Sequence, residues 1–246
     1  VVTNINREHL DYHKTYERYV AAKAILLKHA NVVVLNKDDM SYQRIKKQEL
    51  RSKNKKIVTY GFKKDSDVNP HIFPFKTKLL GRFNEYNSLA AIATLRELHI
   101  PDEIIKRGVA SFKPPAGRQE IIYNKDFCVI NDFAHTPQSF ESLLPEVKKL
   151  SKGKLIHVFG AAAKRDTYKR PEMGKISSQY ADIIILTSED PRNEPIEKIN
   201  DEIAAGIKNS KFEIRNSKQI QNEKFQNNKK YLFKIPDRKE AIEFAV

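Results

Sequence analysis

The feature that most constrains the fold is the regular alternation of short apolar runs and helix-patterned segments in the second half of the chain. Apolar runs at 127–131, 155–159 and 182–186 are each followed by a segment with helical spacing. Thr136 and Pro137 fit the N-cap and the first turn of the first of these helices. Because strands that alternate with helices form βαβ units with parallel strands, the sequence predicts an α/β fold with a mostly parallel sheet.

The rest of the chain carries similar signals, interrupted at one point. The run Pro114-Pro115-Ala116-Gly117 breaks the helical pattern and predicts a domain boundary between 1–115 and 116–246. The stretch 208–230 is rich in Lys, Asn and Gln and is predicted to be irregular. The remaining pattern predicts strands at 31–35 and 57–62, helices at 14–29, 84–98, 102–112, 170–180 and 196–207, and a strand–helix pair at 231–246.

The charge balance favours an anionic partner. The 246 residues include 45 Lys and Arg against 31 Asp and Glu, a formal net charge of +14, which suits phosphates, nucleic acid or a membrane surface. A basic nucleic-acid-binding module is therefore one alternative. However, the charge is dispersed and heaviest in 208–230, which is typical of a solvated surface. We expect no nucleic-acid partner.

The apolar runs and the cysteine content of the sequence bear on its location. The sequence has no apolar run of ~18 residues, so we expect no membrane partner. It has a single cysteine, Cys128, and no secretory signal. These features favour a reducing, cytoplasmic location.

Polar residues follow the predicted strands of the second half. Asp132 follows the first strand, Gly160 the second and Ser188-Glu189-Asp190 the third. In open α/β sheets, ligands bind at the carboxyl ends of the strands, so the sequence predicts a site there. Arg165 and Arg192 could add forks for a carboxylate or phosphate, although basic surface residues of no special role are the alternative for both.

Five side chains in the first half have both a structural and a functional interpretation. Lys23 lies in the apolar stripe of a predicted helix: either its stem covers apolar surface with the ammonium in water, or burial lowers its pKa and leaves a reactive amine. Asn84 and Asn87 lie at a helix start, where asparagine usually caps. His9 and His13 stand four apart, as in some zinc sites, but without the intervening glutamate, which favours incidental histidines.

The sequence contains neither G-x-x-x-x-G-K-S/T nor G-x-G-x-x-G, the two common glycine-rich phosphate cradles. It begins at Val1 and ends at Val246 within an apolar helical pattern. We interpret these features together as those of a piece of a longer protein.

Taken in order, eight segments resemble the Mur ligase family, and within it the branch that adds the third residue of the peptidoglycan stem peptide. Any one segment is weak, but together they span residues 3–195 with family-like order, and DRKEAIEFA at 237–245 resembles a later part of the family. The eight segments are TNINREHLDYH (3–13), YVAAK (19–23), VVLNKDD (33–39), GRFNEYNSLAA (81–91), AGRQE (116–120), NDFAHTP (131–137), FGAAAKRDTYKRPEMG (159–174) and TSEDPRNEP (187–195).

The resemblance implies a fold and an activity. The family has a UDP-binding domain, a central ATPase domain and a Rossmann-like C-terminal domain. Residues 1–115 would be the C-terminal part of the central domain, and residues 116–246 a C-terminal domain truncated at its end. The implied enzyme is a cytoplasmic, monomeric ligase of peptidoglycan and cell wall biosynthesis, and so of cell shape and cell division. It uses ATP and Mg²⁺ to join an amino acid to UDP-MurNAc-dipeptide through an acyl phosphate.

The resemblance also assigns roles to individual residues. The family's catalytic lysine, carbamylated so that it binds Mg²⁺, falls on Lys23, and a histidine that ligates a second Mg²⁺ falls on His9. The other assigned residues are Asn84, Asn87, Arg118 and Asp132 for the nucleotide, and Arg165, Asp190 and Arg192 for the incoming amino acid. Without a phosphate loop, the 246 residues alone are expected to be inactive.

Two segments depart from the family pattern. Ala161-Ala162-Ala163-Lys164 replaces Cys-Gly-Gly-Asp, and because alanine resists the positive φ that glycine allows, this turn is expected to differ. Glu189-Asp190-Pro191-Arg192 replaces the Asp-Asn-Pro-Arg of members that select diaminopimelate. The Asp190 carboxylate would repel a substrate carboxylate and favour an ammonium, so the amino acid that is added stays open. Folylpolyglutamate and cyanophycin synthetases are the alternative within the superfamily, and the strings NDFAHTP and KRPEMG argue against them.

Overall fold

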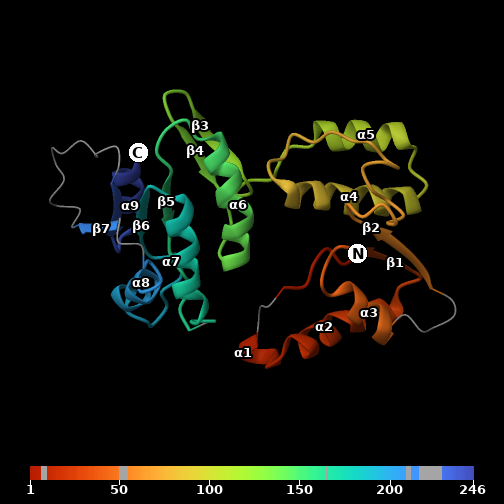
Figure 1. Ribbon diagram of the computed structural model, residues 1–246, viewed down its shortest axis with the longest axis horizontal. Coiled ribbons are helices and arrows are strands. Elements are labelled where there is room, and N and C mark those ends of the chain that lie inside the picture. The colour runs from red at the N-terminus through yellow and green to blue at the C-terminus, as the bar shows by residue number, and fades with distance from the viewer. Residues whose placement is uncertain (7–9, 50–54, 165, 209–211, 216–228) are drawn as a thin grey trace. The chain divides into compact units, whose positions relative to one another are not determined.

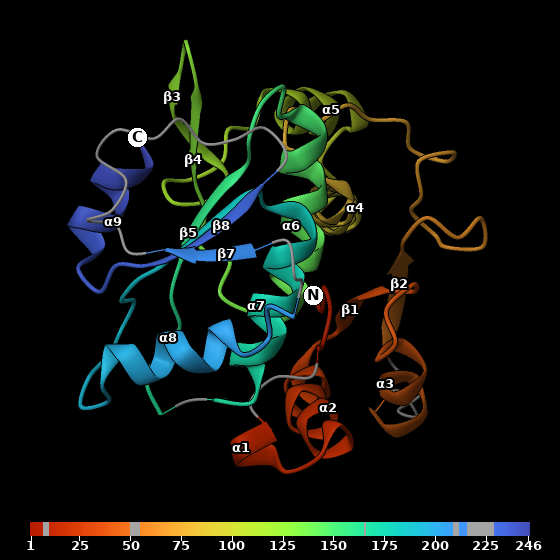
Figure 2. The same ribbon diagram turned by 60° about the vertical axis from the view of Figure 1, so that its left-hand side comes forward.

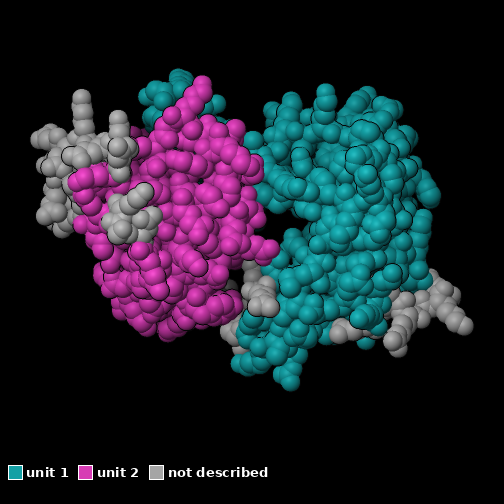
Figure 3. Space-filling model, viewed as in Figure 1, with its two compact units in different colours: residues 1–133 teal, residues 134–246 magenta. Residues whose placement is uncertain are grey.

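The computed structural model describes residues 1–6, 10–49, 55–164, 166–208, 212–215 and 229–246 (Figure 1). The chain divides into two compact units, Val1–Phe133 and Ala134–Val246 (Figure 3). Each unit has its own strand pairing and its own hydrophobic clusters. His9 and Arg165, two of the predicted site residues, lie outside the described residues.

The first unit is built on two parallel strands with helices on both faces. Val33 and Leu35 of β1 pack against α2 and α3, whereas Val34 of β1 and Val58 of β2 pack in a cluster with α4 and α5. This alternation along β1 follows from the period of two in a strand. The elements are α1 (Leu10–His13), α2 (Tyr16–Ala24), the 3₁₀ helix η1 (Ile25–His29), β1 (Val32–Asn36), α3 (Tyr42–Glu49), β2 (Lys56–Tyr60), α4 (Arg82–Glu97) and α5 (Asp102–Ser111).

The first unit ends in an antiparallel hairpin of β3 (Glu120–Asn124) and β4 (Cys128–Asn131). The sequence predicts 127–131 as the first strand of the parallel sheet, and this part of the prediction is wrong, because β4 pairs with β3. The first strand of the hairpin carried no clear signal, since its Ile121 and Ile122 side chains are exposed and give no core-facing pattern.

The second unit is a parallel sheet in the strand order β5-β6-β8-β7. Helices α6, α7 and α8 share a hydrophobic cluster with one face of the sheet, and α9 packs on the other (Figures 1 and 2). The predicted α/β class with parallel sheets is confirmed. The elements are α6 (Pro137–Leu150), β5 (Ile156–Phe159), α7 (Lys169–Tyr180), β6 (Ile183–Leu186), α8 (Ile196–Ala204), β7 (Phe212–Arg215), β8 (Lys230–Lys234) and α9 (Arg238–Ala245).

Local signals account for some of the element boundaries. Thr136 caps α6 as predicted, and its side chain and that of Ser139 form a reciprocal capping box. The helix expected at 14–29 starts at the Thr15 cap and changes to the 3₁₀ form at Ile25. The prediction of an irregular 208–230 is wrong at Phe212–Arg215, which forms β7, while 209–211 and 216–228 lie outside the described residues.

Gly160 and Gly174 allow close approach of neighbouring segments within the second unit. A Cβ at Gly160, directly after β5, would lie 2.2 Å from the backbone oxygen of Thr187, directly after β6. A Cβ at Gly174 in α7 would lie 2.0 Å from the backbone oxygen of Ile203 in α8. Any side chain at either position would force the segments apart, so the loops after β5 and β6 and the two helices are held in direct contact.

Candidate functional site

In the first unit, Asn84 lies at the centre of a buried hydrogen-bond network. Its Nδ2 donates to the backbone oxygen of Leu80 at 2.8 Å and to Oε1 of Gln119 at 2.7 Å. Nδ2 of Asn87 donates to Oδ1 of Asn84 at 3.2 Å. The N-cap of α4 is Gly81, without a side-chain cap bond. Neither asparagine therefore caps the helix, which was the structural interpretation of both. The start of α4 therefore presents two adjacent amide side chains.

Gln119, which the sequence did not single out, joins this network to a third predicted residue. Its Nε2 donates to the Leu80 oxygen at 3.0 Å, and its backbone N–H donates to Oδ2 of Asp132 at 2.8 Å. Gln119 is buried and has φ of 49°, a region that costs energy for a residue with a side chain. Asn84 and Asp132, far apart in the chain, are thus brought together through one strained residue.

Arg118 lies beside this network on the exposed side. Its guanidinium carbon is 4.2 Å from the ring centroid of Phe133, which is itself exposed. A guanidinium stacked on an aromatic ring is held in a defined plane by the cation–π attraction. The segment 117–133 therefore offers a cation, a carboxylate and an exposed ring next to the two asparagines.

Lys23 is exposed on α2, although Tyr19, Val20 and Leu27 of the same stripe are buried. Its Nζ lies 5.5 Å from the centroid of the Tyr19 ring. The snorkelling interpretation describes this placement, with the stem along apolar surface and the amine at the surface. An accessible amine is also what reaction with carbon dioxide requires.

In the second unit, the loops after β5 and β6 lie against each other. The backbone N–H of Ala163 donates to the oxygen of Asp190 at 2.9 Å. Asp190 and Arg192 form an ion pair, Oδ2 to Nε at 3.0 Å, with side chains 49% and 46% exposed. Ala161, Ala162 and Ala163 avoid positive φ, as expected for alanine. The residues of this loop with left-handed φ are Lys164 and Asp166.

A buried ionic cluster that the sequence analysis missed lies beneath these loops. Arg170, at the start of α7, has a fully buried side chain, and its two terminal nitrogens donate to the two carboxylate oxygens of Glu194 at 2.9 and 2.8 Å. The guanidinium also donates to Oε2 of Glu202 at 2.7 Å and to the oxygen of Ala162 at 3.0 Å. The matching of a planar fork to a carboxylate makes such a pair strong and directional.

The cluster shifts the protonation of both partners. The hydrogen bonds from Arg170 and from the Lys164 backbone lower the pKa of Glu194 to about 2. The hydrogen bond to Glu194, together with that to Glu202, raises the pKa of Arg170 despite its burial. Both groups are therefore charged throughout the physiological range. Arg170 stands in the KR string of the sequence, but only its burial distinguishes it from the neighbouring basic residues.

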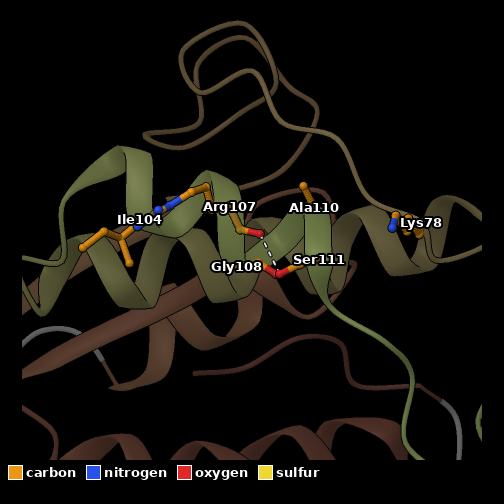
Figure 4. Close-up of a pocket in the computed structure, with 6 residues that line it drawn as sticks. All are labelled: Lys78, Ile104, Arg107, Gly108, Ala110 and Ser111. Carbon is orange, nitrogen blue, oxygen red and sulfur yellow. Dashed lines mark hydrogen bonds between the residues drawn. The ribbon is translucent and has the colours of Figure 1, made fainter.

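A surface hollow of about 670 Å³ lies elsewhere, on α5 of the first unit (Figure 4). None of the predicted site residues lines it. Its lining residues are Lys78, Ile104, Arg107, Gly108, Ala110 and Ser111.

Two negative observations apply to the described part of the chain. No cluster of three or more His, Cys, Asp or Glu side chains there could hold a metal ion. Within the same ranges, no helix is long and apolar enough to cross a membrane.

Family models match both parts of the chain. A model of the Mur ligase middle domain matches residues 1–95, and one described as "Mur ligase, glutamate ligase domain" matches residues 117–246. The two matches leave residues 96–116 between them, and this stretch includes Pro114, Pro115 and Ala116 of the predicted boundary.

Individual proteins give the same result. The UDP-N-acetylmuramoyl-L-alanyl-D-glutamate--2,6-diaminopimelate ligase of Aquifex aeolicus is 41% identical over 223 residues, 83% of this chain and 45% of that protein. The ligase of the same name from Geobacillus kaustophilus is 34% identical and covers 100% of this chain, which covers 52% of it. A solved structure with that name matches with a TM-score of 0.54 and 29% identity, covering 99% of this chain and 50% of the solved one. The chain spans about half the length of these relatives.

Proposed function

Because the chain belongs to the Mur ligase family, we propose that it supplies the nucleotide-binding and amino-acid-binding parts of an ATP-dependent ligase. That ligase adds the third amino acid to UDP-MurNAc-dipeptide in the cytoplasm, as a monomer. The observation that carries the proposal is a relative named as such a ligase that is similar over the whole of this chain. Residues 1–115 and 116–246 are its two domains in this proposal.

The first unit supports a nucleotide site. The exposed Asn87 amide can pair with a donor and an acceptor of a purine base. The Asn84 amide nitrogen already donates to Leu80 and Gln119, so Asn84 can contribute only its Oδ1 as an acceptor. Arg118 and the exposed Phe133 ring lie on the neighbouring segment. In this proposal Asn84 and Asn87 bind the adenine, while Arg118 and Asp132 bind other parts of ATP.

The fit for Mg²⁺ depends on chemistry at Lys23. Magnesium prefers oxygen ligands in octahedral geometry, and an unmodified amine offers none. Carbamylation of the exposed Lys23 would supply two carboxylate-like oxygens for one Mg²⁺, and His9 is the proposed ligand of a second Mg²⁺. Bound Mg²⁺ would neutralise the charge between the attacking carboxylate and the phosphates.

The second unit supports an amino-acid site. Arg192 carries the guanidinium that would bind the substrate carboxylate, and Asp190 carries a carboxylate suited to an ammonium. Because these two side chains pair with each other, the incoming amino acid has to exchange that pair for its own two charges. Arg165 is the third proposed contact.

The proposed reaction forms one amide bond in two steps. The dipeptide carboxylate attacks the γ-phosphorus and ADP leaves, which gives an acyl phosphate. The amino group of the third residue then attacks the acyl carbon, the C–N bond forms, and the C–O bond to phosphate breaks. In this proposal the nucleotide contacts come from the first unit and the amino-acid contacts from the second, so the reaction needs residues of both units.

A ligation assay tests this proposal. These 246 residues replace the similar segment of the full-length Aquifex aeolicus relative, so that the UDP-binding domain, the phosphate loop and the end of the C-terminal domain that the family implies are all present. ADP release and product mass are followed with UDP-MurNAc-dipeptide and each candidate amino acid. We expect a tripeptide product and ADP release that requires both substrates. ADP release without any ligated product would contradict the proposal.

Lys23→Ala in the same protein tests the assigned role of the lysine. Ligation should fall steeply, since removing one group that stabilises charge in a transition state costs roughly 10²–10³-fold. Small carboxylates such as acetate or formate, standing in for the carbamate, should restore part of the activity. Lys28→Ala, an exposed lysine of the adjoining η1, is the matched control and should be as active as the parent.

A further inference from the structure

The two loops that carry the proposed amino-acid site contain backbone strain. Lys164, Asp166 and Arg192 have φ of 54°, 42° and 44°, in the left-handed region. Each such residue costs on the order of 1 kcal/mol or more and persists only where surrounding contacts hold it. Something in the second unit must therefore stabilise this conformation of both loops.

Arg170 donates hydrogen bonds to residues of both loops. One terminal nitrogen donates to the backbone oxygen of Ala162 in the loop after β5, and both donate to Glu194 in the loop after β6. Oε2 of Glu194 also accepts from the backbone N–H of Lys164 at 3.0 Å. Glu202 attaches the cluster to α8. One guanidinium thus joins two loops and two helices.

The cluster has no direct role in holding a ligand. The Arg170 side chain is fully buried and that of Glu194 is 8% exposed, so neither can reach a substrate in solution. The cluster has two carboxylates, Glu194 and Glu202, against the single charge of Arg170. Nζ of Lys198 lies 3.4 Å from Oε1 of Glu194 and offsets part of the excess negative charge. A buried charged cluster is in itself weak evidence for a gain in stability. We therefore assign the cluster a different effect, which is to specify the conformation of the two loops.

We propose that Arg170, through its paired hydrogen bonds to Glu194 and Ala162, is a positioning residue that fixes the two loops in the conformation that binds the incoming amino acid. This inference rests on the proposed function for its catalytic consequence. Its structural part, the restraint of both loops by one guanidinium, is independent of that function.

The structural part is tested in the 246-residue chain by amide hydrogen exchange. Arg170→Lys keeps the charge but cannot form the paired bonds. We expect exchange at the Ala163 and Lys164 amides to rise about tenfold or more, while the amides of Ile184 and Ile185 in β6 stay within about twofold. Glu202→Gln, which removes the charge of a single contact, should act in the same direction and more weakly. Unchanged exchange at Ala163 and Lys164, or an equal rise throughout the unit in both variants, would overturn the inference.

The catalytic part is tested in the active protein used for the ligation assay. Arg170→Lys should raise the KM for the amino acid about tenfold and leave the KM for ATP within about twofold. Lys148→Met is the matched control, because it breaks an ion pair with Asp182 in the same unit without touching either loop. An amino-acid KM that is unchanged in Arg170→Lys would overturn the positioning role. An unmodified protein without ligase activity would overturn the proposed function and leave the exchange result standing.

Discussion

The two units hold their candidate sites together by different means. In the first unit, neutral amides do so: Asn84, Gln119 and Asn87 share hydrogen bonds with one another and with the backbone. In the second unit, buried charges do so: Arg170 binds Glu194 and Glu202 beneath the Asp190–Arg192 loop. Neutral networks cost little to bury, whereas charges are costly to bury and costly to separate. The second site should therefore respond more steeply to mutation and to pH.

The largest expected effect is that of Arg170→Met. Removing one partner leaves the Glu194 carboxylate buried without its main donor, so the free energy of unfolding of the second unit should fall by about 3–5 kcal/mol. Urea titration followed by hydrogen exchange in β6 and β8 measures this unit separately. Lys148→Met, at a partly exposed pair, should cost about 1 kcal/mol or less. Equal losses in the two variants would contradict the special status of the cluster.

Gln119→Ala should have a smaller effect, in the first unit. The Leu80 oxygen keeps the Asn84 amide as a donor, but one N–H of Asn84 loses its acceptor. A buried polar group left unpaired costs about 1–3 kcal/mol. The loss is read from exchange in β1 and β2. Gln43→Ala, at an exposed position of α3, serves as a comparison outside the network. A cost as large as that of Arg170→Met would remove the distinction between the two units.

A further expected effect is an acid sensitivity that is greater in the second unit than in the first. The folded pKa of Glu194 is about 2, below the usual value of 4.5, so its contribution is fully present above pH 4.5 and is lost as the pH falls towards 2. Burial lowers the pKa of His157 to about 3 from 6.5. Its contribution is therefore present above pH 6.5 and is lost as the pH falls towards 3.

Two variants separate these contributions. Glu194→Gln should flatten the stability profile of the second unit mainly below pH 4.5. His157→Gln, which keeps a group able to bond Ser177, should flatten it between pH 6.5 and 3. Urea midpoints from pH 2 to 7 give both profiles. Profiles that match the unmodified protein in both variants would show that other groups control the acid response.

The sequence was sufficient for the parts of the fold that depend on local periodicity. The apolar run 182–186 predicted β6, in which every side chain is buried. The helical pattern over 170–180 predicted α7, in which buried residues recur three or four positions apart. The same reasoning failed at β3 and β7. The exposed Ile121 and Ile122 face no core, and β7 begins in a stretch dominated by polar residues. Their pairing depends on partner strands, which a local pattern does not contain.

The site was predicted where motifs were visible and missed where contacts are long-range. Asn84 and Asp132 were named in advance, but Gln119, which joins them, has no signal of its own in the sequence. Arg170 resembles the other basic residues near it until its burial is known. Hydrogen bonds that span 24 to 35 residues decide both cases, and no spacing rule predicts such contacts.

The most direct test of the account compares Asn84→Ala with Asp190→Ala in the active protein, with KM for ATP and for the amino acid measured in both. We predict that Asn84→Ala raises the KM for ATP about tenfold with little change for the amino acid, and that Asp190→Ala does the reverse. The two sites would then lie in the two units as assigned. If each variant raised both constants equally, or if the pattern were exchanged, the account would be contradicted.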